Sequence, residues 1–155
     1  MKTMNSPRPI AELLDAPGVA LIGRLLLTSP FWISGVLKLF DFPSAVSEAA
    51  HFGLQPAAAV AVAVILLQIG GSMVVILNRW TWLGAGALGV FTALANLIGH
   101  AFWTLPDPMA RFHDMNAFTA NLGLIGGLIL AAILAELRRE HPPQEQANKY
   151  RIFIK

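Results

Sequence analysis

Residues 18–40 read GVALIGRLLLTSPFWISGVLKLF, an apolar run in which Arg24 and Lys38 are the charged side chains. Similar runs occupy residues 56–77, 82–103 and 116–135. A helix of about 20 residues, at a rise of about 1.5 Å each, crosses the ~30 Å hydrocarbon layer of a bilayer. The sequence therefore predicts an all-α integral membrane protein, a four-helix bundle embedded in lipid.

Composition supports one domain and leaves no segment for a soluble one. Of 155 residues, 55% are hydrophobic and 13% charged, and most charges fall between or beyond the four runs. We expect a single transmembrane domain over residues 1–141, with helices at about 18–40, 56–77, 82–103 and 116–140, and a cytoplasmic tail over 142–155. The absence of cysteine excludes a disulfide, a thiol redox centre and a thiolate metal site in this chain.

Basic residues near the membrane ends predict the orientation, because they are retained on the cytoplasmic side. If both termini are cytoplasmic, most of the Lys and Arg residues lie on the cytoplasmic side, and only Arg111 and Lys38 lie on the outer side. The short connection 78–81 makes the second and third helices antiparallel neighbours.

The two outer connections differ in their predicted structure. In residues 41–55, Pro43 suits a first helical turn, Ala45, Ala49 and Phe52 recur at helical spacing, and Gly53 stops the pattern, so we expect a short surface helix. Residues 104–115 contain Pro106 and Pro108 and are expected to be irregular, with the fourth helix starting near Asn116.

Polar residues inside the spans need a reason, because an ionisable side chain in lipid is costly unless it faces other helices or water. Arg24 and Gln68 lie at depths that a long guanidinium can bridge, so we expect an interhelical hydrogen bond between them. The alternative is that Arg24 extends to the headgroups.

A second polar group gathers in the outer third of the bundle. Lys38, Asn96, His100 and Asn121 come from three helices at similar depth, and Asp41 could pair with Lys38. With Trp103 and Phe31 beside them, they form a candidate quinone-binding layer. The alternatives are structural: Lys38 extends outward, His100 hydrogen-bonds at a helix end, and the asparagines join helices.

Other sites are disfavoured by the residues available. His100 is the one histidine within a predicted span, so paired histidine ligands for haem are not expected, and no metal-ligand spacing or nucleic-acid motif appears. The predicted spans hold no carboxylate to couple transport to protons. Small residues in two series, Ala85-Gly89-Ala93 and Gly123-Gly127, are typical of close helix packing.

Several motifs resemble the DoxX family of membrane proteins. They are residues 24–27 (RLLL), 31–39 (FWISGVLKL), 52–56 (FGLQP), 66–71 (LLQIGG), 100–103 (HAFW) and 121–127 (NLGLIGG). The family usually has Glu where this chain has Gln68, so Arg24 lacks the expected carboxylate, and an amide cannot relay protons by titrating. The resemblance implies a multi-pass protein of the bacterial inner (plasma) membrane.

The resemblance also bears on function. Relatives include the membrane subunit of a thiosulfate:quinone oxidoreductase and a scaffold that binds soluble redox enzymes. We therefore expect an accessory or quinone-facing subunit, or membrane anchor, of a redox system, with a soluble enzyme as partner and no self-contained catalytic apparatus in this chain. The alternatives are a non-catalytic scaffold or assembly factor and, third, a small-solute transporter. A homo-oligomer is compatible with all three.

Overall fold

A computed structural model describes residues 7–140 of the chain. The predicted tail, residues 142–155, lies outside the described residues. The elements in chain order are α1 (Arg8–Asp15), α2 (Pro17–Phe40), α3 (Phe42–His51), α4 (Ala57–Ile76), α5 (Thr81–Gly99), the short 3₁₀ helix η1 (Phe102–Thr104) and α6 (Pro108–Glu140). Within the described part, four helical segments are long and apolar enough to cross a membrane, which confirms the predicted all-α four-span architecture.

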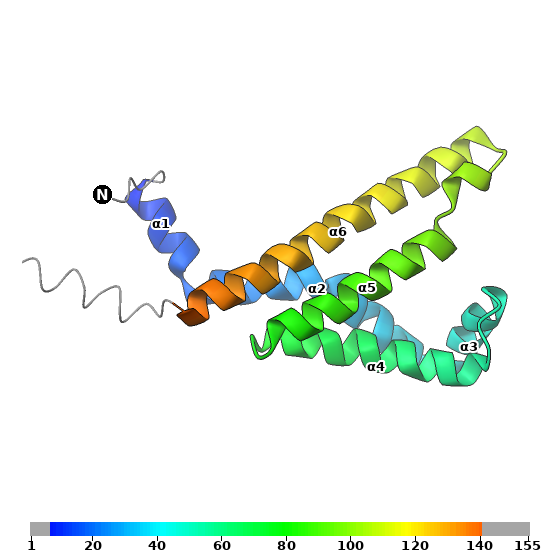
Figure 1. Cartoon of the computed structure of the whole chain (residues 1–155), viewed down its shortest axis with the longest axis horizontal. Helices are drawn as coiled ribbons and strands as arrows, with labels where there is room; N and C mark the ends of the chain where they lie inside the picture. The colour runs from blue at the N-terminus through cyan, green and yellow to red at the C-terminus, as the bar shows by residue number, and fades with distance from the viewer. Residues whose placement is uncertain (1–6, 141–155) are drawn as a thin grey trace, which may run out of the picture.

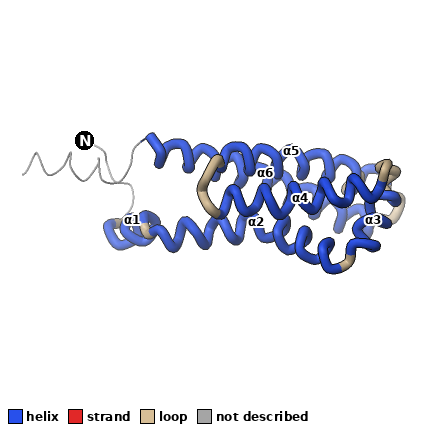
Figure 2. The backbone as a smooth tube through the Cα atoms, turned by 90° about the horizontal axis from the view of Figure 1, so that it is seen from below, coloured by secondary structure: helices blue, strands red, loops and turns tan. Residues whose placement is uncertain are grey.

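The helices form an arrangement that is open along one side. α6 packs along α5, α5 along α4, and α4 along α2, whereas α2 and α6 make few contacts. Figure 1 shows α5 and α6 diverging from α3 and α4 toward one end of the molecule. Figure 2 shows the long helices side by side, with α1 at one end and α3 at the other. We refer to these as the α1 end and the α3 end.

α2 continues through a proline. Pro30 has no N–H to donate to the carbonyl of Leu26, four residues back. The hydroxyl of Ser29 donates to that carbonyl instead, at 2.8 Å. The helix therefore keeps a polar partner for the freed carbonyl, as a span in lipid requires.

α1 was not expected from the sequence. Pro7 precedes it, Pro9 lies in its first turn, and Ile10, Leu13 and Leu14 fall on one side at helical spacing. These three apolar side chains are about half exposed. Such a short amphipathic helix at the bundle's end is typical of one that lies in the membrane interface.

α3 is the short helix predicted between the first two spans. The Asp41 side chain accepts a hydrogen bond from the Ser44 N–H at 3.2 Å, which caps the helix. Gly53 follows with φ +70°, a conformation that a residue without Cβ adopts freely, and the Leu54 N–H returns to the Ala49 carbonyl. α3 packs against α4 and so covers the α3 end of the α2–α4 pair.

The third and fourth spans depart from the predicted bounds. α5 ends at Gly99 rather than 103, and η1 follows after the two non-helical residues His100 and Ala101. α6 begins at Pro108 rather than near Asn116, because Asp107 accepts the Ala110 N–H at 2.7 Å and a proline suits the first helical position. Reading Pro108 as a loop signal was therefore wrong, whereas Pro106 does lie in the irregular stretch between η1 and α6.

The core lies where α4, α5 and α6 meet α2, and its buried members are Phe31, Val75, Ala85, Leu88 and Leu128. Close backbone approach depends on particular glycines. A Cβ at Gly84 would lie 2.8 Å from the carbonyl oxygen of Gly71, and one at Gly127 would lie 2.8 Å from Leu27 Cδ1. Of the predicted small-residue series, Gly89 and Gly123 have no neighbour within 4 Å, so they do not set these approaches.

Candidate functional site

A cavity of about 330 Å³ lies at the α3 end, where α4 and α5 diverge. Its walls come from α2, α3, α4 and α5 and are mostly apolar. The lining residues are Ser34, Lys38, Ala45, Glu48, Ala49, Phe52, Leu54, Val60, Ala61, Val64, Gln68, Phe91, Leu94, Ala95, Ile98 and Gly99. An apolar cavity with a few polar groups is the usual form of a small-molecule site.

An ion pair forms the polar side of this cavity. Lys38 Nζ, in the last turn of α2, bonds the carboxylate of Glu48 on α3. The Lys38 side chain is 19% exposed and that of Glu48 is 51% exposed, so the pair stands between the cavity and the surroundings. The expected pairing of Lys38 with Asp41 is wrong, because the Asp41 carboxylate caps α3.

Gln68 supplies the second polar group of the cavity. Its side chain, from α4, is 5% exposed, and its Oε1 has no hydrogen-bond partner among residues 7–140. Gly35 of α2 lies against it, since a Cβ there would be 3.3 Å from Gln68 Cβ. A buried amide that leaves an acceptor unsatisfied is costly, and a bound donor would relieve that cost.

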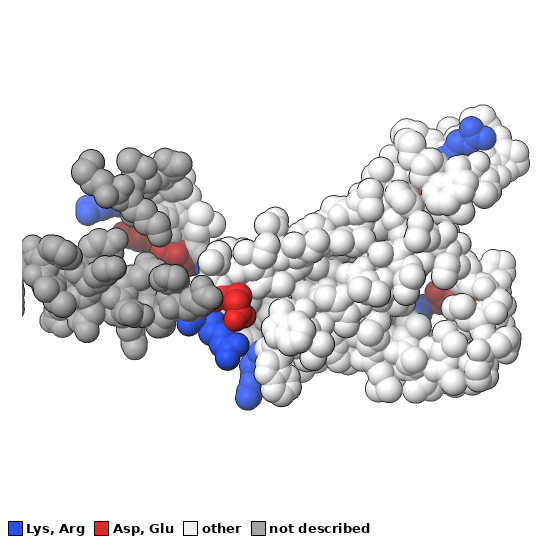
Figure 3. All heavy atoms as spheres, viewed as in Figure 1, with Lys and Arg blue, Asp and Glu red and all other residues white. Residues whose placement is uncertain are grey.

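The α5 side of the cavity is apolar and accessible. Leu94 and Ile98 line it, and their exposed fractions are 57% and 49%. Figure 3 shows a hollow at the α3 end in which cationic and acidic atoms adjoin, with uncharged side chains directly around them. The cavity is therefore open on its α5 side, along a helix that is apolar enough to cross a membrane.

The predicted asparagines lie elsewhere, between α5 and α6. Asn121 Nδ2 donates to Asn96 Oδ1 at 3.0 Å, and Asn96 Nδ2 donates to the Phe118 carbonyl at 3.2 Å. Asn96 is 2% exposed. The Asn96 amide therefore accepts from one residue of α6 and donates to another, and neither asparagine is among the residues that line the cavity.

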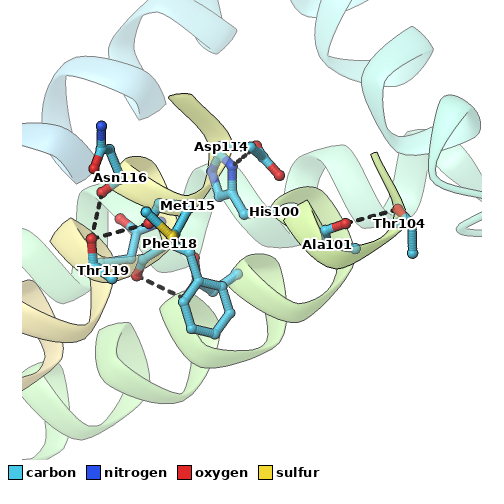
Figure 4. Close-up of polar contacts among 10 residues, drawn as sticks. His100, Ala101, Thr104, Asp114, Met115, Asn116, Phe118 and Thr119 are labelled. Carbon is cyan, nitrogen blue, oxygen red and sulfur yellow. Dashed lines mark hydrogen bonds and ion pairs between the residues drawn. The ribbon is translucent and has the colours of Figure 1, made fainter. Parts of the chain in front are cut away.

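His100 and Trp103 also belong to the α5–α6 side. Figure 4 shows His100, just after α5, directed toward Asp114 of α6, and the His100 Nδ1 to Asp114 Oδ1 distance is 2.7 Å. Trp103 packs edge-on against Phe102 and Phe118, with ring centroids 5.1 and 5.9 Å apart. The structure thus divides the predicted layer: Lys38 lines the cavity, whereas His100 and Trp103 join α5 to α6.

The two remaining predicted residues have structural surroundings. Phe31 is buried in the core and meets Phe91 edge-on, with ring centroids 6.5 Å apart. The expected Arg24–Gln68 hydrogen bond is not formed in the described part, where Arg24 Nε and Gln68 Oε1 are both buried without partners. They cannot serve each other because Gln68 faces the cavity at the α3 end and Arg24 faces a separate cleft beside α6.

Sequence reasoning missed two carboxylates. Glu48 was placed on a surface helix, and Asp114 in an irregular loop, yet Glu48 lines the cavity and Asp114 lies within the fourth candidate span. The 33 residues of α6 exceed the length that a hydrocarbon layer needs, so the absence of a carboxylate from the lipid-crossing run itself stays a prediction. The capping pattern Asp107-Pro108 was the signal that could have placed Asp114 on a helix.

Comparison with known proteins gives one match. A family model described as DoxX matches residues 19–101, from the start of α2 through the end of α5. No curated protein matches the chain, and no solved structure does. The matched residues include the whole cavity lining, Lys38, Glu48 and Gln68 among them.

Proposed function

Because the chain belongs to the DoxX family, we propose that it is an accessory membrane subunit of a redox system and that its cavity at the α3 end holds a quinone ring. The observation that carries this proposal is the combination of an apolar cavity, an ion pair at its side and a buried, unsatisfied Gln68 amide. The earlier candidates Asn96, His100, Asn121 and Trp103 serve the α5–α6 contact in this proposal.

The chemistry of the cavity suits a quinone. A quinone ring is flat and apolar, with carbonyl oxygens that accept hydrogen bonds, and both the Lys38 ammonium and the Gln68 amide can donate. In the reduced form its hydroxyl groups donate, and Gln68 Oε1 can accept. A volume of about 330 Å³ is at the lower end for ligand sites, which favours a ring over a whole isoprenoid molecule.

Access and proton supply follow from the walls of the cavity. A quinone tail would remain in lipid beside Leu94 and Ile98 while the ring enters between α4 and α5. Reduction of a quinone takes up two electrons and two protons. The electrons come from a soluble partner that oxidises the substrate, and the half-exposed Glu48 exchanges protons with water.

The test is quinone binding by the full chain in lipid nanodiscs, measured by quenching of tryptophan fluorescence. The double variant Lys38→Gln, Glu48→Gln removes both charges together and should weaken binding by roughly tenfold, since a hydrogen bond to a charged group contributes ~1.5–3 kcal/mol. A second variant, Ala95→Leu, should weaken binding by filling the cavity from an exposed position of α5.

Each variant has a matched control. His100→Gln, Asp114→Asn changes the other side-chain pair at the α3 end, the one between His100 and Asp114, and Ala93→Leu adds the same bulk to an exposed position of α5 that lines a different groove. Both controls should bind quinone like the parent. Equal losses in the cavity variants and the controls, or no loss in either, would reject the cavity and favour the scaffold alternative.

A further inference from the structure

A second cleft, of about 370 Å³, lies at the α1 end, where α2 and α6 separate. Its floor is where Leu27 meets Gly127, and it runs from there toward the turn between α4 and α5. Its lining residues are Ala20, Gly23, Arg24, Leu27, Asn78, Gly127, Leu130, Ala131, Leu134, Ala135 and Arg138. The cleft is apolar except for two arginines and one asparagine.

The two guanidinium groups face a common space, and no acidic residue among 7–140 lines it. Arg24 lies about 10 Å into α2 from Pro17, at a rise of about 1.5 Å per residue. Its Nε is buried and has no hydrogen-bond partner among residues 7–140. Arg138, in the last turn of α6, lines the same cleft. Like charges in one low-dielectric cleft repel, so an anion between them would stabilise both.

The neighbouring basic residue behaves differently. Arg139 is directed to Glu136, with Nη1 and Oε1 3.8 Å apart, and does not line the cleft. Figure 3 shows that cationic atoms gather at the α1 end of the molecule, with acidic atoms beside some of them. Arg24 and Arg138 thus line an apolar cleft, whereas Arg139 lies on the mixed-charge surface beside it.

We propose that this cleft binds the headgroup phosphate of an anionic phospholipid. Two guanidinium groups and the Asn78 amide supply donors that match phosphate oxygens. Leu27, Leu130 and Leu134 make the rest of the lining apolar, which suits the beginning of an acyl chain and which a free phosphate ion would not use. Basic pockets between membrane helices are typical sites for anionic headgroups.

The experiment measures lipid retention by the full chain. Purified protein in neutral detergent is titrated with phosphatidylglycerol or phosphatidylcholine, and bound lipid is counted by native mass spectrometry. Arg24→Gln and Arg138→Gln should each weaken phosphatidylglycerol binding by roughly fivefold or more, because one basic residue near a membrane surface contributes about 1 kcal/mol to anionic-lipid attraction. The parent should bind phosphatidylcholine more weakly than phosphatidylglycerol, and neither arginine variant should change its binding of phosphatidylcholine.

Controls separate a built site from general attraction. Arg139→Gln removes the same charge one residue away and should bind phosphatidylglycerol like the parent, and Arg24→Lys should retain more binding than Arg24→Gln. Arg138 is exposed at the end of α6, so its variant tests the proposal even if Arg24→Gln fails to fold. Helical content by circular dichroism identifies such a failure.

Three results would overturn the proposal. Equal weakening by Arg139→Gln would mean diffuse attraction to the α1 end. Inorganic phosphate that raises the unfolding temperature as much as phosphatidylglycerol, with the same dependence on Arg24 and Arg138, would identify a free anion as the occupant. Equal retention of both lipids by every variant would mean that the arginines do not select the headgroup.

Discussion

Gln68 is the residue whose surroundings are hardest to explain by packing alone. Gln68 is only 5% exposed and lines a cavity. Its Oε1 has no hydrogen-bond partner in the described part. A residue kept only for stability would be better replaced by an apolar one of similar volume, because nothing in the described part repays burial of the amide oxygen. We therefore expect the Gln68 amide to favour ligand binding and to lower the free energy of unfolding, so that its two effects can be measured separately.

That separation gives a prediction for Gln68→Leu. The free energy of unfolding of the variant should be about 1 kcal/mol greater than that of the parent, because the substitution removes an unsatisfied buried acceptor. Its affinity for quinone should fall by roughly fivefold or more, because the substitution also removes a hydrogen-bonding group from the cavity. Reversible unfolding in mixed micelles and the fluorescence titration measure the two quantities. A less stable variant that binds quinone normally would show that Gln68 is structural.

At the scale of the helices, two glycines of α5 make a matched pair. Gly84→Ala would place a methyl group 2.8 Å from the Gly71 carbonyl oxygen of α4, whereas a Cβ at Gly86 has no neighbour within 4 Å. We expect Gly84→Ala to lower the free energy of unfolding by about 1–3 kcal/mol through overpacking. Gly86→Ala should raise it slightly, because alanine has the higher helix propensity. Equal effects would mean that α4 and α5 do not approach as described.

The asparagine pair between α5 and α6 is the second prediction at this scale. Asn121 donates to Asn96 across the two helices. A double-mutant cycle of Asn96→Ala and Asn121→Ala should give a coupling energy of about 0.6–1.7 kcal/mol, the range typical of hydrogen bonds between membrane helices. Quinone binding by both single variants should stay near that of the parent. Additive stability effects would contradict a direct bond.

For the whole molecule, the expected orientation in the membrane follows from the distribution of charge along the chain. The distribution of Lys and Arg predicts that the α1 end is cytoplasmic. The absence of cysteine makes single-cysteine labelling clean. In intact cells, a membrane-impermeant maleimide should label Ser47→Cys on α3 and not Leu77→Cys, at the end of α4 near the α4–α5 turn. The reverse pattern would invert the topology and place the proposed lipid site in the opposite leaflet.

The open arrangement of the helices places the two proposed sites at opposite ends. α4 and α5 diverge at the α3 end and enclose one cavity, while α2 and α6 separate at the α1 end and leave the other. α5 and α6 remain in contact through the Asn96–Asn121 and His100–Asp114 pairs. The polar groups predicted as one layer thus divide between a cavity and a helix contact.

The sequence by itself determined the membrane class and the four spans, because crossing lipid demands about 20 apolar residues in a row and such runs are visible without any contact. It also placed Lys38, Asn96, His100 and Asn121 at similar heights, since height follows from residue number at a fixed rise. It misplaced the start of α6, where a capping Asp107 and a proline at the first turn were read as loop residues.

Only the tertiary structure decided which polar groups meet. Two side chains at one height can face different neighbours, and the direction each one faces depends on helix rotation and on which helices touch. Lys38 meets Glu48 because α3 folds back over α2 and α4, and His100 meets Asp114 because α6 starts before the lipid-crossing run. The partners are only 10 and 14 residues apart, but each pair spans a turn between helices, where hydropathy and spacing carry no information about which side chains meet.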